Sequence, residues 1–449
     1  MRIALLLVML LSSTVHAEEA QEQGRQWTRL VLETAGLFAI GQAWYWRDGR
    51  STNSGDWELP GNWSAIDRKL TGDGFRFDGD GFVTNAVKHP LFGATAFELA
   101  RENGFGLAGA FAMSTLASGA WEVFGEWREF GSINDMLTTS TAGVPLGETL
   151  HQIAHHLRRT HFELYAGAGD HRELGRTRGF DMIGLRGELD LVPGRGMVAD
   201  TEGFVTDGRH VGFSIQVPFD REGVRARDVA AKTAVLGYYR SRIARDVDGE
   251  LDGFSLFAGV DAAFDYHQIL ERPGGDTSPD NTWDLLATVA TGPALELDLH
   301  RGGFQLHAAL DATVDFAMIK SWAFDRWRAM HPDAVVRGAL QTNPHAYYYA
   351  AGVALAPQLA ASYRGVSLGV ALGGSAFSSL DGHDRYRDML TMDPHLDDSD
   401  TSASAWLRAD VHGVLLELDA HARHRASRIE DVTGDHREGA LMASVGYRL

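Results

Sequence analysis

Two glutamates, Glu122 and Glu126, stand four residues apart in the run SGAWEVFGEW at positions 118–127. Residues i and i+4 of a helix lie on one face, so a helix here would present both carboxylates side by side. Paired carboxylates can serve as general acid and general base, because one can hold its proton while the other releases it. The spacing therefore makes Glu122 and Glu126 candidate catalytic residues.

Two further sets of polar side chains recur at helical spacing. Asn85 and His89 lie four residues apart, although Pro90 follows directly and disfavours a helix through this point. A second stripe, at i, i+3 and i+7, consists of Glu148, His151 and His155. Carboxylates and imidazoles that meet at one centre could carry protons or bind a divalent metal ion. No cofactor is evident from the sequence, and a divalent metal remains possible.

All these residues fall in a part of the chain that we expect to be helical. Hydrophobic spacing predicts helices over 25–46, 84–101, 106–129 and 147–159, with a Gly-, Asp- and Trp-rich connector over 47–80. On the third helix, Ser114 and Ser118 extend the stripe of Glu122 and Glu126 by two turns. We therefore divide this part into an N-terminal helix with its connector, residues 18–74, and a helical domain, residues 75–159.

The first seventeen residues predict export. Arg2 is followed by the apolar run Ile3–Leu11, and Val15-His16-Ala17 forms a small-residue cleavage site. The apolar run is too short to span a bilayer as a helix. Residues 1–17 are therefore expected to be a signal peptide.

Composition excludes several classes of protein. The 449 residues carry a formal net charge of −19, which argues against a nucleic-acid partner. The mean hydropathy of −0.18 is too polar for a bundle of membrane helices. The chain has no cysteine, so disulfides, thiolate metal sites and cysteine nucleophiles are all excluded.

Residues 160–449 alternate with a period of two. In 294–313, for example, Leu295, Leu297 and Leu299 alternate with charged or polar residues, and a tight turn at 301–303 leads into a second alternating run. We count about twelve such segments, many of ten residues or more, as a tilted membrane strand requires. Tight turns at 301–303, 364–365 and 412–413 contrast with the longer connections 268–281, 320–345 and 379–403.

This pattern predicts a transmembrane antiparallel β-barrel of about twelve strands in the outer membrane, with the helical domain packed in or under it like a plug. A soluble β-sandwich also alternates, but its strands are shorter and its polar face carries fewer charges of both signs. The expected partners are outer-membrane lipid and the barrel-assembly machinery. Oligomeric state stays open.

An ordered set of residues in the helical part resembles a known family. The residues are Phe77, Asp78, Asp80, Phe82, Asn85, His89, Pro90, Gly93, Arg101, Gly104, Trp121, Glu122, Glu126, Ser132, Asp135, Gly143, Gly147 and Glu148. Over residues 75–150 the chain looks like the DUF3943 family, a group of predicted Gram-negative envelope proteins with no established activity. A more distant likeness is to helical membrane proteins of the VanZ type.

The resemblance adds residues to the candidate site. Asp135 joins Glu122, Glu126 and His89 as a candidate catalytic residue. The candidate binding residues are Asn85, Arg101, Ser118, Ser132, Glu148 and His151.

Three interpretations of this polar set remain open. It could be a structural network in which Glu122 and Glu126 pair with arginines on the inner face of the barrel, as in a plugged channel or a scaffold. It could be the site of an enzyme that acts on an envelope lipid or a small periplasmic substrate. It could also line a gated conduit and set its selectivity. Whether the protein is an enzyme is uncertain from the sequence.

Overall fold

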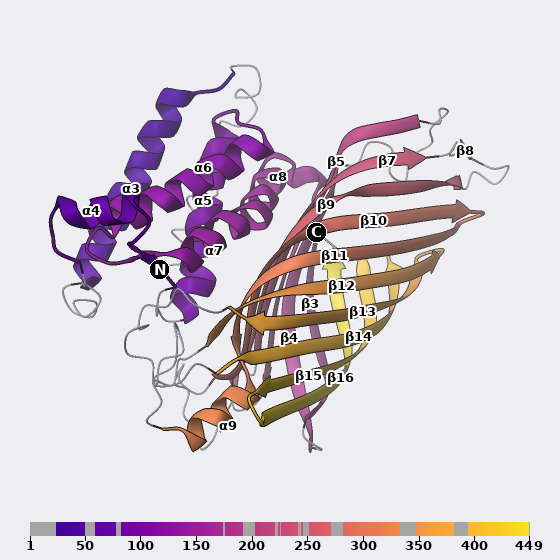
Figure 1. Ribbon diagram of the computed structural model, residues 1–449. Coiled ribbons are helices and arrows are strands. Elements are labelled where there is room, and N and C mark those ends of the chain that lie inside the picture. Colours follow the sequence, from indigo (N-terminus) through magenta and orange to yellow (C-terminus); the bar gives the residue numbers. More distant parts are fainter. Residues whose placement is uncertain are drawn as a thin grey trace. The chain divides into compact units, whose positions relative to one another are not determined.

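The computed structural model describes residues 24–49, 59–77, 82–173, 176–191, 203–220, 223–224, 226–240, 244–245, 251–270, 282–332, 347–380 and 394–448. These residues form two compact units, a helical unit that ends at Arg158 and a barrel unit that begins at Arg159 (Figure 1). The predicted signal peptide lies outside the described residues.

The barrel unit contains twelve long strands. In chain order they are β3 (His161–Glu173), β4 (Arg176–Asp190), β5 (Gly203–Asp220), β7 (Ala226–Arg240), β9 (Leu251–Leu270), β10 (Thr282–Arg301), β11 (Phe304–Lys320), β12 (Tyr348–Tyr363), β13 (Val366–Ser379), β14 (Leu396–Val411), β15 (Val414–Ile429) and β16 (Val432–Arg448). Two-residue strands β6 (Gly223–Val224) and β8 (Ala244–Arg245) pair with β5 and β9. Neighbouring strands run antiparallel throughout.

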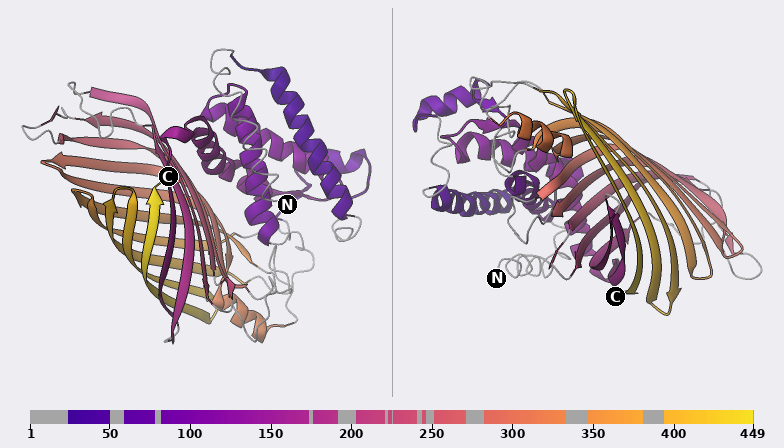
Figure 2. Two further views of the ribbon diagram at one scale, coloured as in Figure 1. Left: turned by 180° about the vertical axis from the view of Figure 1, so that it is seen from behind. Right: turned by 90° about the horizontal axis from the view of Figure 1, so that it is seen from below.

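The sheet closes on itself. The ring order is β10 to β16 in sequence, then β3, β4, β5, β7 and β9, and β9 pairs again with β10 (Figure 2). The closing ladder runs from Thr282 opposite Leu270 to His300 opposite Gly253. The prediction of a closed antiparallel barrel of about twelve strands with a helical N-terminal part is confirmed.

The outer face of the barrel carries an apolar belt. On β15 the outward residues Val414, Leu416 and Leu418 are followed by Ala420 and Ala422, and the corresponding positions of β13, β14 and β16 are also apolar. This span of nine residues matches the length a tilted strand needs to cross the hydrocarbon core. Beyond the belt the same outer face becomes polar.

The tight turns have a simple backbone explanation. Arg364 and Gly365 both have positive φ, at 50° and 82°, and His412 and Gly413 have φ of 55° and 85°. Two successive positive φ values are typical of the two-residue turn that matches the twist of antiparallel strands. The turns predicted at these two places are therefore confirmed.

Several strands extend further than predicted. β14 begins at Leu396 and β16 at Val432, in both cases several residues before the hydrophobic alternation of the strand begins. In these added parts the outward residues are polar, so hydrophobic alternation disappears although the hydrogen-bonded ladder continues. The β15–β16 connection is also short, contrary to the expected long loops at that end.

The helical unit is built around a central helix, α5. Its elements are α3 (Trp27–Gly49), α4 (Trp63–Leu70), β1 (Phe75–Arg76), η1 (Thr84–Lys88), α5 (His89–Glu102), α6 (Leu107–Ala120), η2 (Trp121–Gly125), β2 (Gly131–Ser132), α7 (Ile133–Gly143), η3 (Val144–Glu148), α8 (Thr149–His155) and η4 (Leu157–Arg159). α5 packs against α6 and α7. Helix α4 was missed by the sequence analysis, which took its residues as connector. None of the helices in the described residues has the length and hydropathy to span a membrane.

Close backbone approach explains two glycines of the helical unit. A Cβ on Gly93 of α5 would lie 1.8 Å from the carbonyl oxygen of Thr139 on α7, and one on Gly147 would meet Phe97 at 2.7 Å. Only a residue without a side chain lets these helices pack at this distance.

Candidate functional site

The three turns labelled η1, η2 and η3 are π-helical, and each carries one candidate residue. Asn85 lies in η1, Glu122 in η2 and Glu148 in η3, and all three are buried. A π turn holds one extra residue per turn, so it changes the direction in which the following side chains point. Two prolines accompany these turns. Pro90 stands at the start of α5, directly after η1, and Pro145 lies within η3.

A first polar cluster lies at the N-terminal end of α5. His89 Nε2 is 3.4 Å from Asp135 Oδ2, and Asn134 Nδ2 donates to Asp135 Oδ1 at 2.9 Å. Ser132 caps α7 by accepting a hydrogen bond from the Asp135 backbone N–H, and the Ser132 N–H donates to Glu122 Oε2 at 2.7 Å. The structure therefore brings His89, Asp135, Ser132 and Glu122 together, as predicted for part of the set.

Glu122 and Glu126 do not share one helix face, and they accept hydrogen bonds from different partners. The helix turns into η2 at Trp121 and ends at Glu126, so the expected helix over 106–129 is wrong at its end. Glu126 Oε1 accepts from Trp121 Nε1 at 2.9 Å, whereas Glu122 accepts from Ser132. The i, i+4 rule fails here because the π turn shifts Glu126 off the stripe.

Lys69 of α4 binds the end of this turn. Its Nζ donates to the carbonyl oxygens of Glu122 and Glu126, and its side chain is buried. Burial lowers the pKa of Lys69, while the charges of Glu122, Glu126 and Glu129 act in the opposite direction. The acidic residues of this turn are thus balanced by a lysine in the helical unit.

A second polar cluster lies at the C-terminal end of α5. Arg101 Nε pairs with Glu148 Oε2 at 2.8 Å, and Gln152 donates to Glu148 Oε1 at 2.6 Å. Glu102 Oε1 lies 3.0 Å from His151 Nδ1 and 2.7 Å from His155 Nε2. Burial alone would raise the pKa of Glu102, but hydrogen bonds from the two histidines hold it at about 2.

The candidate residues therefore form two centres and not one. Arg101 follows His89 by twelve residues on the same helix, which separates the clusters by about 18 Å. Asn85, His89, Ser132, Asp135 and Glu122 belong near the first cluster, and Arg101, Glu148 and His151 to the second. Ser118 is buried on α6. The expectation of a common centre is wrong because α5 holds the two groups at opposite ends.

Sequence reasoning missed four residues of these clusters, namely Lys69, Asn134, Glu98 and Glu102. Glu98 and Glu102 stand at the same i, i+4 spacing that drew attention to Glu122 and Glu126. The spacing in the sequence could therefore have identified Glu98 and Glu102. Lys69 and Asn134 carry no such pattern, since tertiary packing alone brings them to the site.

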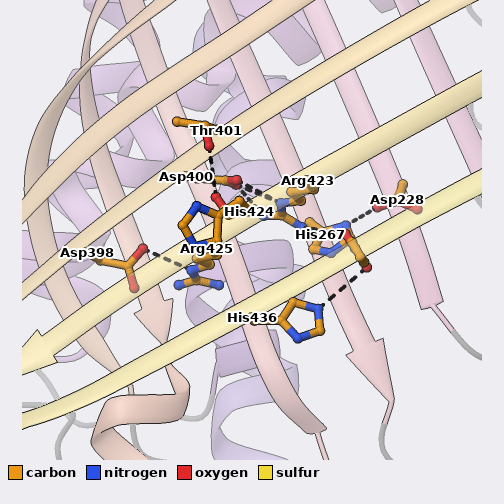
Figure 3. A network of polar contacts seen from close by, with 10 residues as sticks. Asp228, His267, Asp398, Asp400, Thr401, Arg423, His424, Arg425 and His436 are labelled. Carbon is orange, nitrogen blue, oxygen red and sulfur yellow. Dashed lines mark hydrogen bonds and ion pairs between the residues drawn. The ribbon is translucent and has the colours of Figure 1, made fainter. Parts of the chain in front are cut away.

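The inner face of the barrel is charged. Near the tight turns, Glu163, Arg186, Arg408 and Glu417 form a closed ring of ion pairs with separations of 2.6–3.4 Å. Near the other end, Arg425 pairs with Asp398 at 2.9 Å and Arg423 with Asp400 at 2.8 Å (Figure 3). Arg408 and Arg423 both point inward, as expected of arginines on the inner face, and the acidic partners named here belong to the barrel itself.

A second wall of the barrel is acidic. Lys232 Nζ lies 2.6 Å from Asp311 Oδ2 and 3.2 Å from Asp261 Oδ2. Asp265 and Asp315 follow on the same inward faces of β9 and β11. In the ring order, these strands lie roughly across from β14, β15, β3 and β4. The arginines named on one wall are each paired with carboxylates, while on the facing wall four carboxylates accompany Lys232, namely Asp261, Asp265, Asp311 and Asp315.

Glu98 predicts a pH dependence of the helical unit. Burial, together with the charges of Glu102 and Glu148, raises the pKa of Glu98 from 4.5 to about 8 against the effect of Arg101. Because the folded state disfavours ionised Glu98, the helical unit is most stable below about pH 4.5, where Glu98 is protonated in both the folded and the unfolded state. This stability is lost as the pH rises through 8. Glu98→Gln should therefore stabilise α5 at pH 9 by on the order of a few kcal/mol and have little effect at pH 5.

Hydrogen–deuterium exchange of α5 peptides, compared between variant and wild type at each pH with EDTA present, measures this difference. Asp67→Asn, which changes an exposed carboxylate on α4, is the control and should leave the pH dependence unchanged. Equal protection of wild type and Glu98→Gln at pH 9 would contradict the prediction.

Comparison with solved structures finds β-barrels of the outer membrane. The chain resembles the NanC porin at 9% identity and a TM-score of 0.27, covering 64% of this chain and 100% of that one. It resembles the translocator domain of autotransporter NalP from Neisseria meningitidis at 10% identity and a TM-score of 0.23, covering 65% and 88%. The channel DcaP of Acinetobacter baumannii gives 11% identity and a TM-score of 0.23, covering 65% and 96%. At these TM-scores the similarity assigns no function to this chain.

Comparison by sequence gives one informative match. No protein of curated function matches the chain. The likeness to VanZ-type proteins gains no support. Residues 74–169 match the model of a domain of unknown function, DUF3943, which supports the resemblance found from residues 75–150.

Proposed function

We propose that this chain is an outer-membrane channel for small hydrated solutes, in which the helical unit acts as a structural plug or gate. The apolar belt on β13 to β16 supports a barrel surrounded by lipid, because charged outward residues are costly within the hydrocarbon core. Insertion would depend on the barrel-assembly machinery. The plug-like placement of the helical unit stays a prediction.

The water-accessible lumen is the observation that carries this proposal. Inward side chains of the described barrel keep part of their surface accessible, including Lys232 at 35% and His307 at 32%. β12 places Ala356 and Gln358 inward, and both are exposed. Most inward residues of β12 and β13 are Gly, Ala or Ser, so this wall leaves space that larger side chains would fill.

A short helix narrows one end of this lumen. β11 ends at Lys320, and Ala323 N already donates to Ser427 Oγ on the inner face of β15, four strands further round the ring. Ala323 belongs to α9 (Trp322–Met330), which packs along β15 and β16 (Figure 1). Trp327 of α9 is fully buried and donates from Nε1 to Glu430 Oε2 at 3.0 Å. We propose that α9 acts as a constriction at this mouth.

An envelope enzyme is the second candidate function. The contact of His89 with buried Asp135, beside the π turns η1 and η2, is the observation that favours it, because π turns occur often at functional sites. Such an enzyme would act on lipid or a small periplasmic substrate, with His89 as the proton carrier. Altered lipid composition in cells with His89→Ala, without any change in conductance, would favour this function.

Trp327→Ala should increase the single-channel conductance of the full chain in planar bilayers. Removing a fully buried tryptophan costs about 3–5 kcal/mol, and this loss would release α9 from β15 and β16. Tyr363→Ala changes an outward aromatic residue at the opposite end and is the matched control. A wild-type chain without discrete current steps, or a Trp327→Ala chain with unchanged steps, would count against the channel with this constriction.

Asp311→Asn should lower the preference of the channel for cations. Asp311 shares Lys232 with Asp261 on the acidic wall, so neutralising it removes one of the carboxylates that attract cations to the lumen. Reversal potentials under a salt gradient measure the change. Asp397→Asn, on the outer face near the barrel end, should leave the reversal potential as in wild type, and an equal shift in both variants would contradict the assignment.

A further inference from the structure

We propose that Glu102, His151 and His155, together with Glu98, bind a divalent transition-metal ion such as Zn²⁺ between α5 and α8. This site lies in the second polar cluster and does not depend on the channel function. Its four side chains come from two helices, each of which presents a pair at i, i+4 spacing. A pair at this spacing lies on one helix face, as metal-binding helices require.

The potential ligand atoms already lie close together. One carboxylate oxygen of Glu102 and one ring nitrogen each of His151 and His155 all fall within 4.8 Å of one another. The imidazole rings of His151 and His155 have their centroids 4.3 Å apart. Since Zn²⁺ binds imidazole nitrogen at about 2.0–2.1 Å and carboxylate oxygen at about 2.0–2.2 Å, small side-chain rotations would bring the three atoms onto one ion.

Glu98 provides an independent reason to expect a cation. Its Oε1 atom is buried and accepts no hydrogen bond from the described residues. It also lies in the field of two other carboxylates, Glu102 and Glu148, against the single positive charge of Arg101. A buried carboxylate among like charges is costly unless it is paired or binds a metal. With both histidines neutral and Glu98 ionised on binding, these four groups carry a net charge of −2, which one divalent ion would neutralise.

The surroundings hold the ligands in place. Arg101, which precedes Glu102 on α5, pairs with Glu148. Glu148 also accepts a hydrogen bond from Gln152 of α8, the residue that follows His151. These contacts join the two helices beside the site and would orient the ligands, as outer-shell partners of metal sites do. Glu102 and His151 each keep only 11% of their side-chain surface exposed, while His155 keeps 22% and gives the ion a route from solvent.

The ligand types select the class of metal. Imidazole nitrogen together with carboxylate suits Zn²⁺ and its first-row neighbours, whereas Ca²⁺ and Mg²⁺ prefer oxygen ligands alone. Co²⁺ can replace Zn²⁺ as a spectroscopic probe, because a four-coordinate Co²⁺ absorbs visible light far more strongly than the hydrated ion.

The test uses the full chain in detergent, stripped with EDTA and then dialysed against Co²⁺ or Zn²⁺. We expect one ion per chain, a visible Co²⁺ spectrum of four-coordinate type, and a higher melting temperature of the helical unit with Zn²⁺. The double variant His151→Ala/His155→Ala should lose the spectrum, and Glu102→Gln and Glu98→Gln should each weaken Co²⁺ binding by about tenfold or more. His156→Ala, which changes the neighbouring histidine, is the matched control and should bind as wild type does.

Two results would overturn the site. One is a wild-type chain that binds less than one Co²⁺ per chain or gives only the spectrum of the hydrated ion. The other is a double variant that binds as wild type does. Exchange protection of α5 in Glu102→Gln and Glu98→Gln shows whether the helices are intact, so a loss of binding with protection retained supports ligation. These readouts are separate from conductance, which stays a test of the channel alone.

Discussion

The pairing of β9 with β10 is the constraint on which the rest of the barrel depends. This ladder closes the ring, so all twelve long strands have two neighbours and no edge is left open. In lipid an unpaired backbone N–H or C=O costs several kcal/mol, because no water is present to satisfy it. Closure also gives every strand an inner and an outer face. Because successive side chains alternate, every second residue points into the barrel. Leu416 and Leu418 thereby face outward, and Glu417 between them joins the inner ring of ion pairs.

The barrel unit and the helical unit each pair charged residues among their own side chains. The barrel satisfies its inner arginines with its own carboxylates, as Arg408 does with Glu417 and Glu163. Within the helical unit, Glu122 accepts from the Ser132 N–H, and the charges of Glu122 and Glu126 act on Lys69. The polar residues at the two ends of α5 belong to the helical unit, which is where we place a metal ion and where an enzyme site would also lie.

Much of the fold followed from the sequence because period-two alternation and glycine turns are local signals. Twelve strands and the turns at Arg364 and His412 were predicted for that reason. Strand ends such as Leu396 were not, because polar outward residues beyond the apolar belt carry no hydrophobic alternation. Several residues of the two polar clusters were named from the sequence, but their arrangement was not predicted, and Glu98 and Glu102 were missed. A π turn at Trp121 breaks the spacing on which the Glu122–Glu126 pair rested, and the length of α5 divides one expected centre into two.

Labelling of single cysteines tests the central claim, a water-filled lumen inside an apolar outer face, most directly. The chain has no cysteine, so Gln358→Cys and Leu359→Cys each introduce one thiol, on opposite faces of adjacent positions in β12. In lipid vesicles, a water-soluble and membrane-impermeant maleimide should label Gln358→Cys rapidly and leave Leu359→Cys unlabelled until the barrel is denatured. Equal labelling of both thiols, or faster labelling at position 359, would contradict the account.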